Sequence, residues 1–252
     1  MFIHLSAVLM LAVTFSPAAA QRRPAAPRET PAAAPGAADR ERDDLTAPVL
    51  PARRLSMPAS EAPPALPPGA DRVQPLTLDV RLTTRTNGRT ETRVQTVTRA
   101  ADRIHVATAT GVEWLFERNP VDPRRVAASA VRHGERTIVV YGESDLRMAL
   151  GIPGWAHVLT MGVDARALTP AAAEARTVAG LRFLKTGIES ANGTHTLWWN
   201  AEQLLPLEYA ARENGLTVVK ITPGAEPSRL WAPEVRFPGY RVMEFADWLE
   251  EH

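Results

Sequence analysis

Histidine, serine and carboxylate side chains are the residues of this sequence that could do chemistry. The chain has no cysteine, which excludes a thiol nucleophile, thiolate metal ligands and disulfide bridges. The histidines show neither the H-E-x-x-H pattern nor another paired spacing of a zinc site; those beyond residue 100 and before the C-terminus are His105, His133, His157 and His195. His105 and His195 could meet across strands, but lone strand histidines usually have structural roles. We therefore predict no metal site and no cofactor.

Serine and carboxylate chemistry has equally little support. Gly142–Leu146 reads G-E-S-D-L and lacks the last glycine of the nucleophile-elbow pattern G-x-S-x-G. Glu113, Glu117 and Asp122 near Trp114 suggest a carboxylate pair for glycosidic chemistry, although carboxylates on a strand face are normally solvated. Since no nucleophile, base and orienting group can be combined, we assign no catalytic residue, and a hydrolase with an unfamiliar site ranks last.

Any site must be positioned by strands, and the clearest strands lie between Gly180 and Thr222. Four strand-forming runs alternate there with three turn signals, which are Ala191–Gly193, the corner Asn200–Pro206 and Asn214–Gly215. The last pair fits the positive-φ positions of a type I′ turn. This pattern predicts an antiparallel meander.

Two adjacent tryptophans carry the most functional information in the meander. Successive strand residues point to opposite faces, so Trp198 and Trp199 place an indole on each face. We expect Leu197 and Trp199 to lie in the concavity of a curved sheet and Trp198 on the convex face. Either both faces are covered, or Trp198 faces a partner surface, where aromatic residues are enriched.

Six more strands precede the first helix signal. Leu76, Leu78, Val80 and Leu82 alternate with polar residues, and Asn87–Gly88 turns this strand into the next. The following runs cover 104–108, 112–116, 126–133 and 136–141. A short helix that ends at Leu150 is predicted, with Ser144 or Glu143 as its N-cap, and a second helix is predicted over 154–161. A terminal helix with Phe245, Trp248 and Leu249 on one face should dock on the sheet.

The N-terminal 70 residues differ from the rest in composition. Residues 1–20 have a short apolar run and an A-x-A end, as in a secretory signal peptide, with an uncleaved anchor as the lesser alternative. Residues 21–70 are rich in proline and alanine and without aromatic residues, which predicts a disordered tether. The folded domain should cover residues 71–252. We expect a periplasmic or secreted protein without a transmembrane span in its mature chain.

Net charge is +1, and every basic residue except Lys185 and Lys220 is an arginine, interspersed with acids. Because no basic stripe is present, nucleic acid is not an expected partner.

The order of six strands, a helical insertion, four strands and a terminal helix predicts a mainly β protein with some α structure: a single curved antiparallel sheet, or half-barrel, wrapped around the helices. With the run Gly193–Asn200 followed by Leu205-Pro206-Leu207, it resembles the periplasmic half-barrel superfamily of lipoprotein carriers and their relatives. The resemblance implies an apolar concavity. Its expected ligand contacts are Trp114, Phe116, Trp155, Leu159, Leu197, Trp199 and Tyr209.

Two functions therefore precede the hydrolase. The first is an exported, non-enzymatic binding domain that holds a lipid or another hydrophobic or acyl ligand in the concavity. The second is an envelope protein–protein interaction module that uses the sheet face around Trp198. Peripheral contact with a membrane is compatible with either function.

Overall fold

The computed structural model describes residues 62–86, 89–190, 193–210, 214–224 and 231–251. Residues from Pro63 onward belong to one compact unit. Pro63 and Ala70 are already buried and Leu66 packs on the main core. The predicted signal peptide and residues 21–61 of the predicted tether lie outside the described residues, so both stay predictions.

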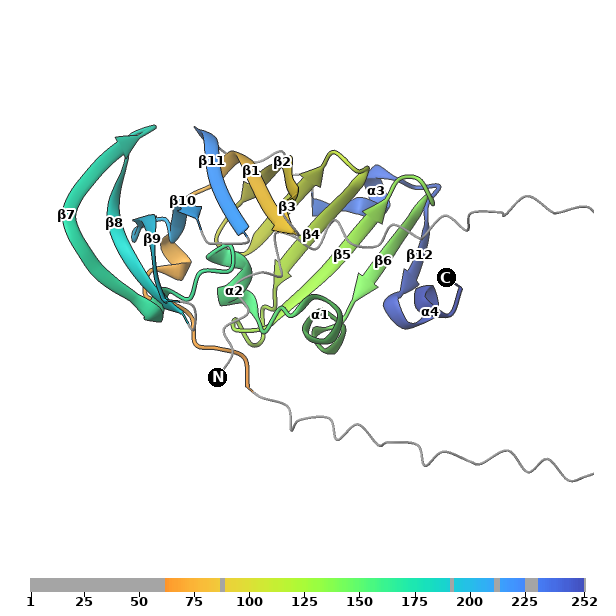
Figure 1. Ribbon diagram of the computed structural model, residues 1–252. Helices are drawn as coiled ribbons and strands as arrows, with labels where there is room; N and C mark the ends of the chain where they lie inside the picture. The colour runs from red at the N-terminus through yellow and green to blue at the C-terminus, as the bar shows by residue number, and fades with distance from the viewer. Residues whose placement is uncertain (1–61, 87–88, 191–192, 211–213, 225–230, 252) are drawn as a thin grey trace, which may run out of the picture. The chain divides into compact units, whose positions relative to one another are not determined.

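A twelve-stranded, curved sheet organises the described chain, in the order β12-β6-β5-β4-β3-β2-β1-β11-β10-β9-β8-β7 (Figure 1). Its strands are β1 Leu76–Thr86, β2 Arg89–Arg99, β3 Arg103–Thr108, β4 Val112–Arg118, β5 Val126–Arg132, β6 Thr137–Tyr141, β7 Leu168–Val178, β8 Leu181–Ser190, β9 Gly193–Asn200, β10 Leu205–Ala210, β11 Asn214–Pro223 and β12 Arg241–Glu244. All neighbours pair antiparallel except β12, which runs parallel to β6. The predicted single antiparallel half-barrel sheet is thus confirmed, with one parallel strand at its edge.

The strands form where apolar and polar residues alternate. In β1 the side chains of Leu76, Leu78, Val80 and Leu82 are buried, whereas the intervening residues are half-buried or exposed. β1 pairs with β2 up to Thr86 opposite Arg89, so the predicted hairpin is confirmed, although its turn residues 87–88 are outside the described residues. Short connections of this kind make sequence neighbours pair with each other.

Helices lie between β6 and β7 and in the C-terminal segment. They are α1 Glu143–Leu150, α2 Trp155–Leu159, α3 Pro233–Arg236 and α4 Phe245–Glu251, with short 3-10 turns η2 Ala70–Arg72 and η3 Ala165–Ala167. The predicted cap of α1 at Glu143 or Ser144 is wrong, because the N-cap residue is Gly142, whose backbone N–H donates to Asp145 Oδ2 at 2.8 Å. The helix ends at Gly151, which has a φ of 64°, the left-handed conformation that glycine adopts without steric cost.

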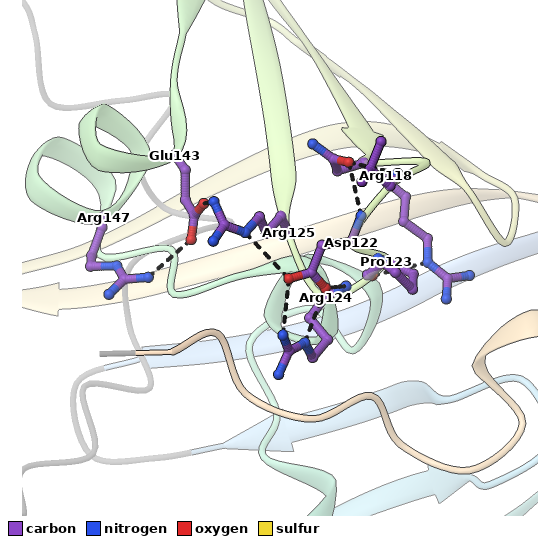
Figure 2. Close-up of polar contacts among 9 residues, drawn as sticks. Arg118, Asp122, Pro123, Arg124, Arg125, Glu143 and Arg147 are labelled. Atoms are coloured by element: carbon purple, nitrogen blue, oxygen red, sulfur yellow. Dashed lines mark hydrogen bonds and ion pairs between the residues drawn. The ribbon is translucent and has the colours of Figure 1, made fainter. Parts of the chain in front are cut away.

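The loop between β4 and β5 is held by its own side chains and supports α2 (Figure 2). Asp122 accepts hydrogen bonds from both Arg124 and Arg125, and these bonds, Arg124's above all, hold the pKa of Asp122 well below its usual range. Glu143 at the start of α1 pairs with Arg125 and Arg147. The ordered loop presents the carbonyl oxygen of Arg124 to the backbone N–H of Trp155 at 2.8 Å, which fixes the start of α2.

Buried side chains form two clusters on opposite faces of the sheet. The main core contains the inward side chains of the strands together with Leu146 and Leu150 of α1 and Trp155 and Leu159 of α2; we call this the inner face. The smaller cluster contains Leu115, Val131 and Ile138, and the segment Trp231–Tyr240 packs on it. This segment covers the outer face of β4 to β6.

Several details of the predicted order are wrong. Asn214 and Gly215 belong to β11, paired with Thr84 and Ala210 respectively, so they do not form the turn. The sequence pattern missed β7, which contains Pro170, and the four-residue β12. Both are edge strands, where a proline and a short length are tolerated because half of the hydrogen-bonding groups are unpaired. In α4, Phe245 and Trp248 are buried as expected, but Leu249 is exposed.

Candidate ligand-binding site

Six of the seven predicted ligand contacts lie together on the inner face. Trp114 and Phe116 from β4, Trp155 and Leu159 from α2, and Leu197 and Trp199 from β9 all belong to the main core, and none is more than 7% exposed. The rings of Trp114 and Phe116 stack with their centroids 5.8 Å apart. The seventh residue, Tyr209, is half-buried and packs against the margin of this core. Residues from distant parts of the chain thus converge on one apolar surface.

Trp198 points to the opposite side of β9 from Trp199, yet its half-buried ring also packs against the main core. The guanidinium carbon of Arg176 is 4.4 Å from the centroid of its ring, and Arg176 also donates to Glu208 Oε2 at 2.9 Å. Trp198 itself is half-buried. A cation–π contact of this kind at a partly exposed site stabilises by about 0.5–1 kcal/mol.

Arg99, at the end of β2, is a residue of the inner face that the sequence analysis missed. It pairs with Leu76 and Ile104, both in the main core, and its own side chain is 0% exposed. Nη2 donates to the carbonyl oxygen of Gln203 at 2.8 Å and Nη1 to that of Leu204 at 3.4 Å. Its Nε has no hydrogen-bond partner among the described residues.

The corner between β9 and β10 meets Arg99 across the inner face. β1 and β11 separate β2 from β10 in the sheet, so the contact requires the sheet to curl until this corner folds over one end of the inner face. Asn200 Oδ1 accepts from the N–H of Gln203 at 2.6 Å, and Asn200 Nδ2 donates to the carbonyl oxygen of Arg182 at 2.8 Å. Leu204 is buried and has a φ of 49°, a conformation that is uncommon for a residue with a Cβ and costs about 1–3 kcal/mol.

Further buried donors of the inner face lack partners in the part of the chain that the structure describes. They include Gln95 Nε2 on β2, Trp114 Nε1 on β4 and Trp155 Nε1 on α2, and Arg93 Nη1 on β2 is a further one. Buried polar groups are hydrogen-bonded in the great majority of cases, so these orphaned donors on one face, together with Arg99 Nε, form an unusual concentration. The sequence could have indicated Gln95 and Arg99, because strand alternation places both on the same face of β2 as the buried Val97.

A second polar cluster lies on the outer face around Glu113. His105 Nε2 donates to Glu113 Oε2 at 2.8 Å, His133 Nε2 to Oε1 at 2.9 Å, and Arg236 Nη1 to Oε2 at 2.9 Å. The hydrogen bond from His105, followed by those from Arg236 and His133, holds the pKa of Glu113 well below its usual range although burial opposes this. His133 Nδ1 also lies 3.0 Å from the Tyr240 hydroxyl. The cluster fastens the segment Trp231–Tyr240 to the sheet.

The geometry corrects two sequence-based expectations. His105 on β3 and His195 on β9 do not meet, since His105 binds Glu113 on the outer face whereas the ring of His195 lies 6.1 Å from that of Tyr209 on β10. Glu113 precedes Trp114 in sequence but points to the opposite face, and its carboxylate is saturated by cationic and imidazole donors rather than paired with Glu117 or Asp122. Within the described ranges, no group of three or more His, Cys, Asp or Glu residues is arranged to hold a metal ion.

The described helices are all too short or too polar to cross a membrane.

No protein-family model matches the chain. No curated protein matches its sequence.

Solved structures with a similar fold include PNGF-II, a DUF1329 family protein from Desulfovibrio piger and a LolA superfamily protein from Nitrosomonas europaea. PNGF-II is 11% identical with a TM-score of 0.43 over 71% of this chain, which spans about a third of the length of that protein (33%). The Desulfovibrio protein is 9% identical with a TM-score of 0.36, covering 67% of this chain and 93% of the other. The Nitrosomonas protein is 10% identical with a TM-score of 0.22, covering 65% of this chain and 94% of the other.

A protein of the superfamily that the sequence resembles is thus among the similar structures. Because the TM-scores of these three matches are below 0.5, the matches bear on neither a ligand nor a reaction.

Proposed function

We propose that this protein is an exported, non-enzymatic binding protein that holds a hydrophobic or acyl ligand against the inner face of its sheet. The observation that carries this proposal is the convergence of Trp114, Phe116, Trp155, Leu197 and Trp199, from three separate segments, on one apolar surface. A large concave apolar surface with a few polar groups is the usual setting of a small-molecule site.

The covering of the inner face is suited to opening. Short helical elements contribute to this covering in the described chain: α1 has eight residues, α2 has five and α4 has seven. Isolated helices of this length are marginal in water, so their order depends on packing against the sheet. A ligand that replaces these contacts with its own apolar surface can therefore displace the helices at a modest free-energy cost.

Fluorescence titration with the apolar probe 1-N-phenylnaphthylamine tests the proposal, together with lipid extraction and mass spectrometry of the protein as purified. We expect saturable binding or a co-purified lipid. The variant Tyr209→Ala, at the margin of the inner face, should weaken probe binding severalfold, whereas Trp198→Ala, on the opposite face, should leave it unchanged. A clean extract together with absence of probe binding would refute the proposed function.

An envelope interaction module remains the second candidate, with Trp198 as its contact residue. Its support is the half-exposed indole, although Arg176 already covers one face of that ring. Crosslinking in cells should recover one dominant partner that is lost in Trp198→Ala. An unchanged crosslinking pattern in that variant would exclude this role for the indole.

A further inference from the structure

From Arg99 we infer that the ligand of the inner face is an anionic amphiphile, whose carboxylate or phosphate head group binds the Arg99 guanidinium while its acyl chain lies along the apolar side chains. This inference rests on the proposed function and specifies the chemical class of the ligand.

The charge of Arg99 is the first argument. Burial lowers the pKa of Arg99 to about 10, so the guanidinium is still a cation at neutral pH. No ion pair joins it to any described carboxylate; its two partners are the neutral carbonyls of Gln203 and Leu204. A buried charge without a counter-charge is strongly disfavoured in a protein interior. A bound anion would supply the missing charge.

The unused donors are the second argument. A guanidinium has five N–H groups in a planar fork that matches the two oxygens of a carboxylate or phosphate. Nη2 and Nη1 each donate to one backbone carbonyl, and the bond from Nη1 is long at 3.4 Å. Nε has no hydrogen-bond partner among the described residues. The Nε–H lies parallel to one N–H of Nη2, which is the arrangement of donors that binds an anion side-on.

The character of the other orphaned atoms is the third argument. Gln95 Nε2, Trp114 Nε1 and Trp155 Nε1 are all donors, so each lacks an acceptor. A wholly hydrocarbon ligand would leave them unsatisfied. An amphiphile with acceptor oxygens can satisfy some of them, which favours an oxygen-rich head group over an alkane-like ligand.

The position of Arg99 is the fourth argument. It lies at the end of β2, beside the corner Asn200–Leu205 that folds over the end of the inner face. An anionic head group held there would sit at the end of the apolar surface, and its chain would lie along the apolar side chains of the inner face. This arrangement separates the polar and apolar parts of an amphiphile as its own chemistry requires.

Three ligands of equal chain length test the inference: palmitate, hexadecyl phosphate and neutral hexadecanol, each measured by displacement of 1-N-phenylnaphthylamine below its aggregation concentration. We expect the wild-type protein to bind at least one of the two anions at least tenfold more tightly than hexadecanol, since charge-assisted, bidentate hydrogen bonds are among the strongest. The two anions distinguish a carboxylate from a phosphate head group.

Arg99→Met keeps the length of the side chain and removes the charge. It should abolish the preference for the anion and leave hexadecanol binding within about twofold. Arg176→Met, an arginine on the other face, is the matched control and should keep the preference.

Equal binding of hexadecanol and both anions by the wild-type protein overturns the inference and leaves the proposed function intact, and so does a preference that persists in a folded Arg99→Met variant. If none of the three ligands displaces the probe, the inference also fails. If the probe itself does not bind and no lipid co-purifies, the proposed function fails with it. If Arg99→Met does not fold, Arg99→Lys is used in its place. Loss of most of the anion preference in Arg99→Lys supports the bidentate contact, and an undiminished preference in that variant contradicts it.

Discussion

The two adjacent tryptophans should respond very differently to truncation. Trp199 is 7% exposed and belongs to the main core, whereas Trp198 is half-buried on the other face under Arg176. We predict that Trp199→Ala destabilises the domain by about 3–5 kcal/mol, the usual cost of replacing a buried aromatic side chain with alanine. Trp198→Ala should cost less, about 2–3 kcal/mol.

The magnitudes follow from the burial of each ring. Burying a whole tryptophan removes about 200 Å² from water, which at about 25 cal/mol/Å² stabilises by about 5 kcal/mol as an upper bound. Nearly all of this applies to Trp199. For Trp198 a smaller share of this area is buried, and a cation–π contact of about 0.5–1 kcal/mol is lost with it, but Arg176 keeps its ion pair with Glu208 at 2.9 Å.

Urea denaturation of both variants, followed by circular dichroism, measures the difference. Both variants should keep the wild-type dependence of unfolding free energy on urea concentration, so that the shift in midpoint reports stability alone. Equal and large destabilisation by both substitutions would refute the assignment of the two faces. It would also remove Trp198 as a candidate for partner binding.

Two further predictions concern the outer face and the loop that supports α2. Because the folded state lowers the pKa of Glu113, the stability that this carboxylate contributes is fully present above its unfolded pKa of about 4.3 and is lost as the pH falls below that value. The destabilisation caused by Glu113→Gln, measured by urea titration, should therefore shrink between pH 7 and pH 3. A destabilisation that does not change with pH would contradict this prediction. In Gly154→Ala the new Cβ would lie 2.6 Å from the carbonyl oxygen of Arg124, so we expect the unfolding free energy to fall by about 1–3 kcal/mol and the melting temperature to drop. The control Gly134→Ala, with nothing within 4 Å of its Cβ, should change the unfolding free energy by less than about 1 kcal/mol. Equal effects of the two substitutions would show that the loop adjusts to the new Cβ without a cost in stability.

The sequence by itself determined the architecture of the sheet. Alternation of apolar and polar residues in segments such as Leu76–Leu82 places one face of each strand in the core, and short turns force neighbouring segments to pair. These are local properties, so the predicted meander, the inserted helices and the inward orientation of Trp199 agree with the structure. The edge strands β7 and β12 were not predicted, because an edge strand can contain proline or be very short and then lacks the usual strand pattern.

The tertiary structure decided which polar residues come together. Arg99 and Gln203 are 104 positions apart, and their contact depends on how far the sheet curls, which no local pattern specifies. Likewise, Glu113 has one histidine eight positions away and another twenty positions away, but only the β3–β4–β5 register and the returning segment at Arg236 bring all three donors to one carboxylate. Strand periodicity determines the face on which a side chain lies. Its contacts on that face depend on the strand register, on the curvature of the sheet and on distant segments of the chain that pack back onto it.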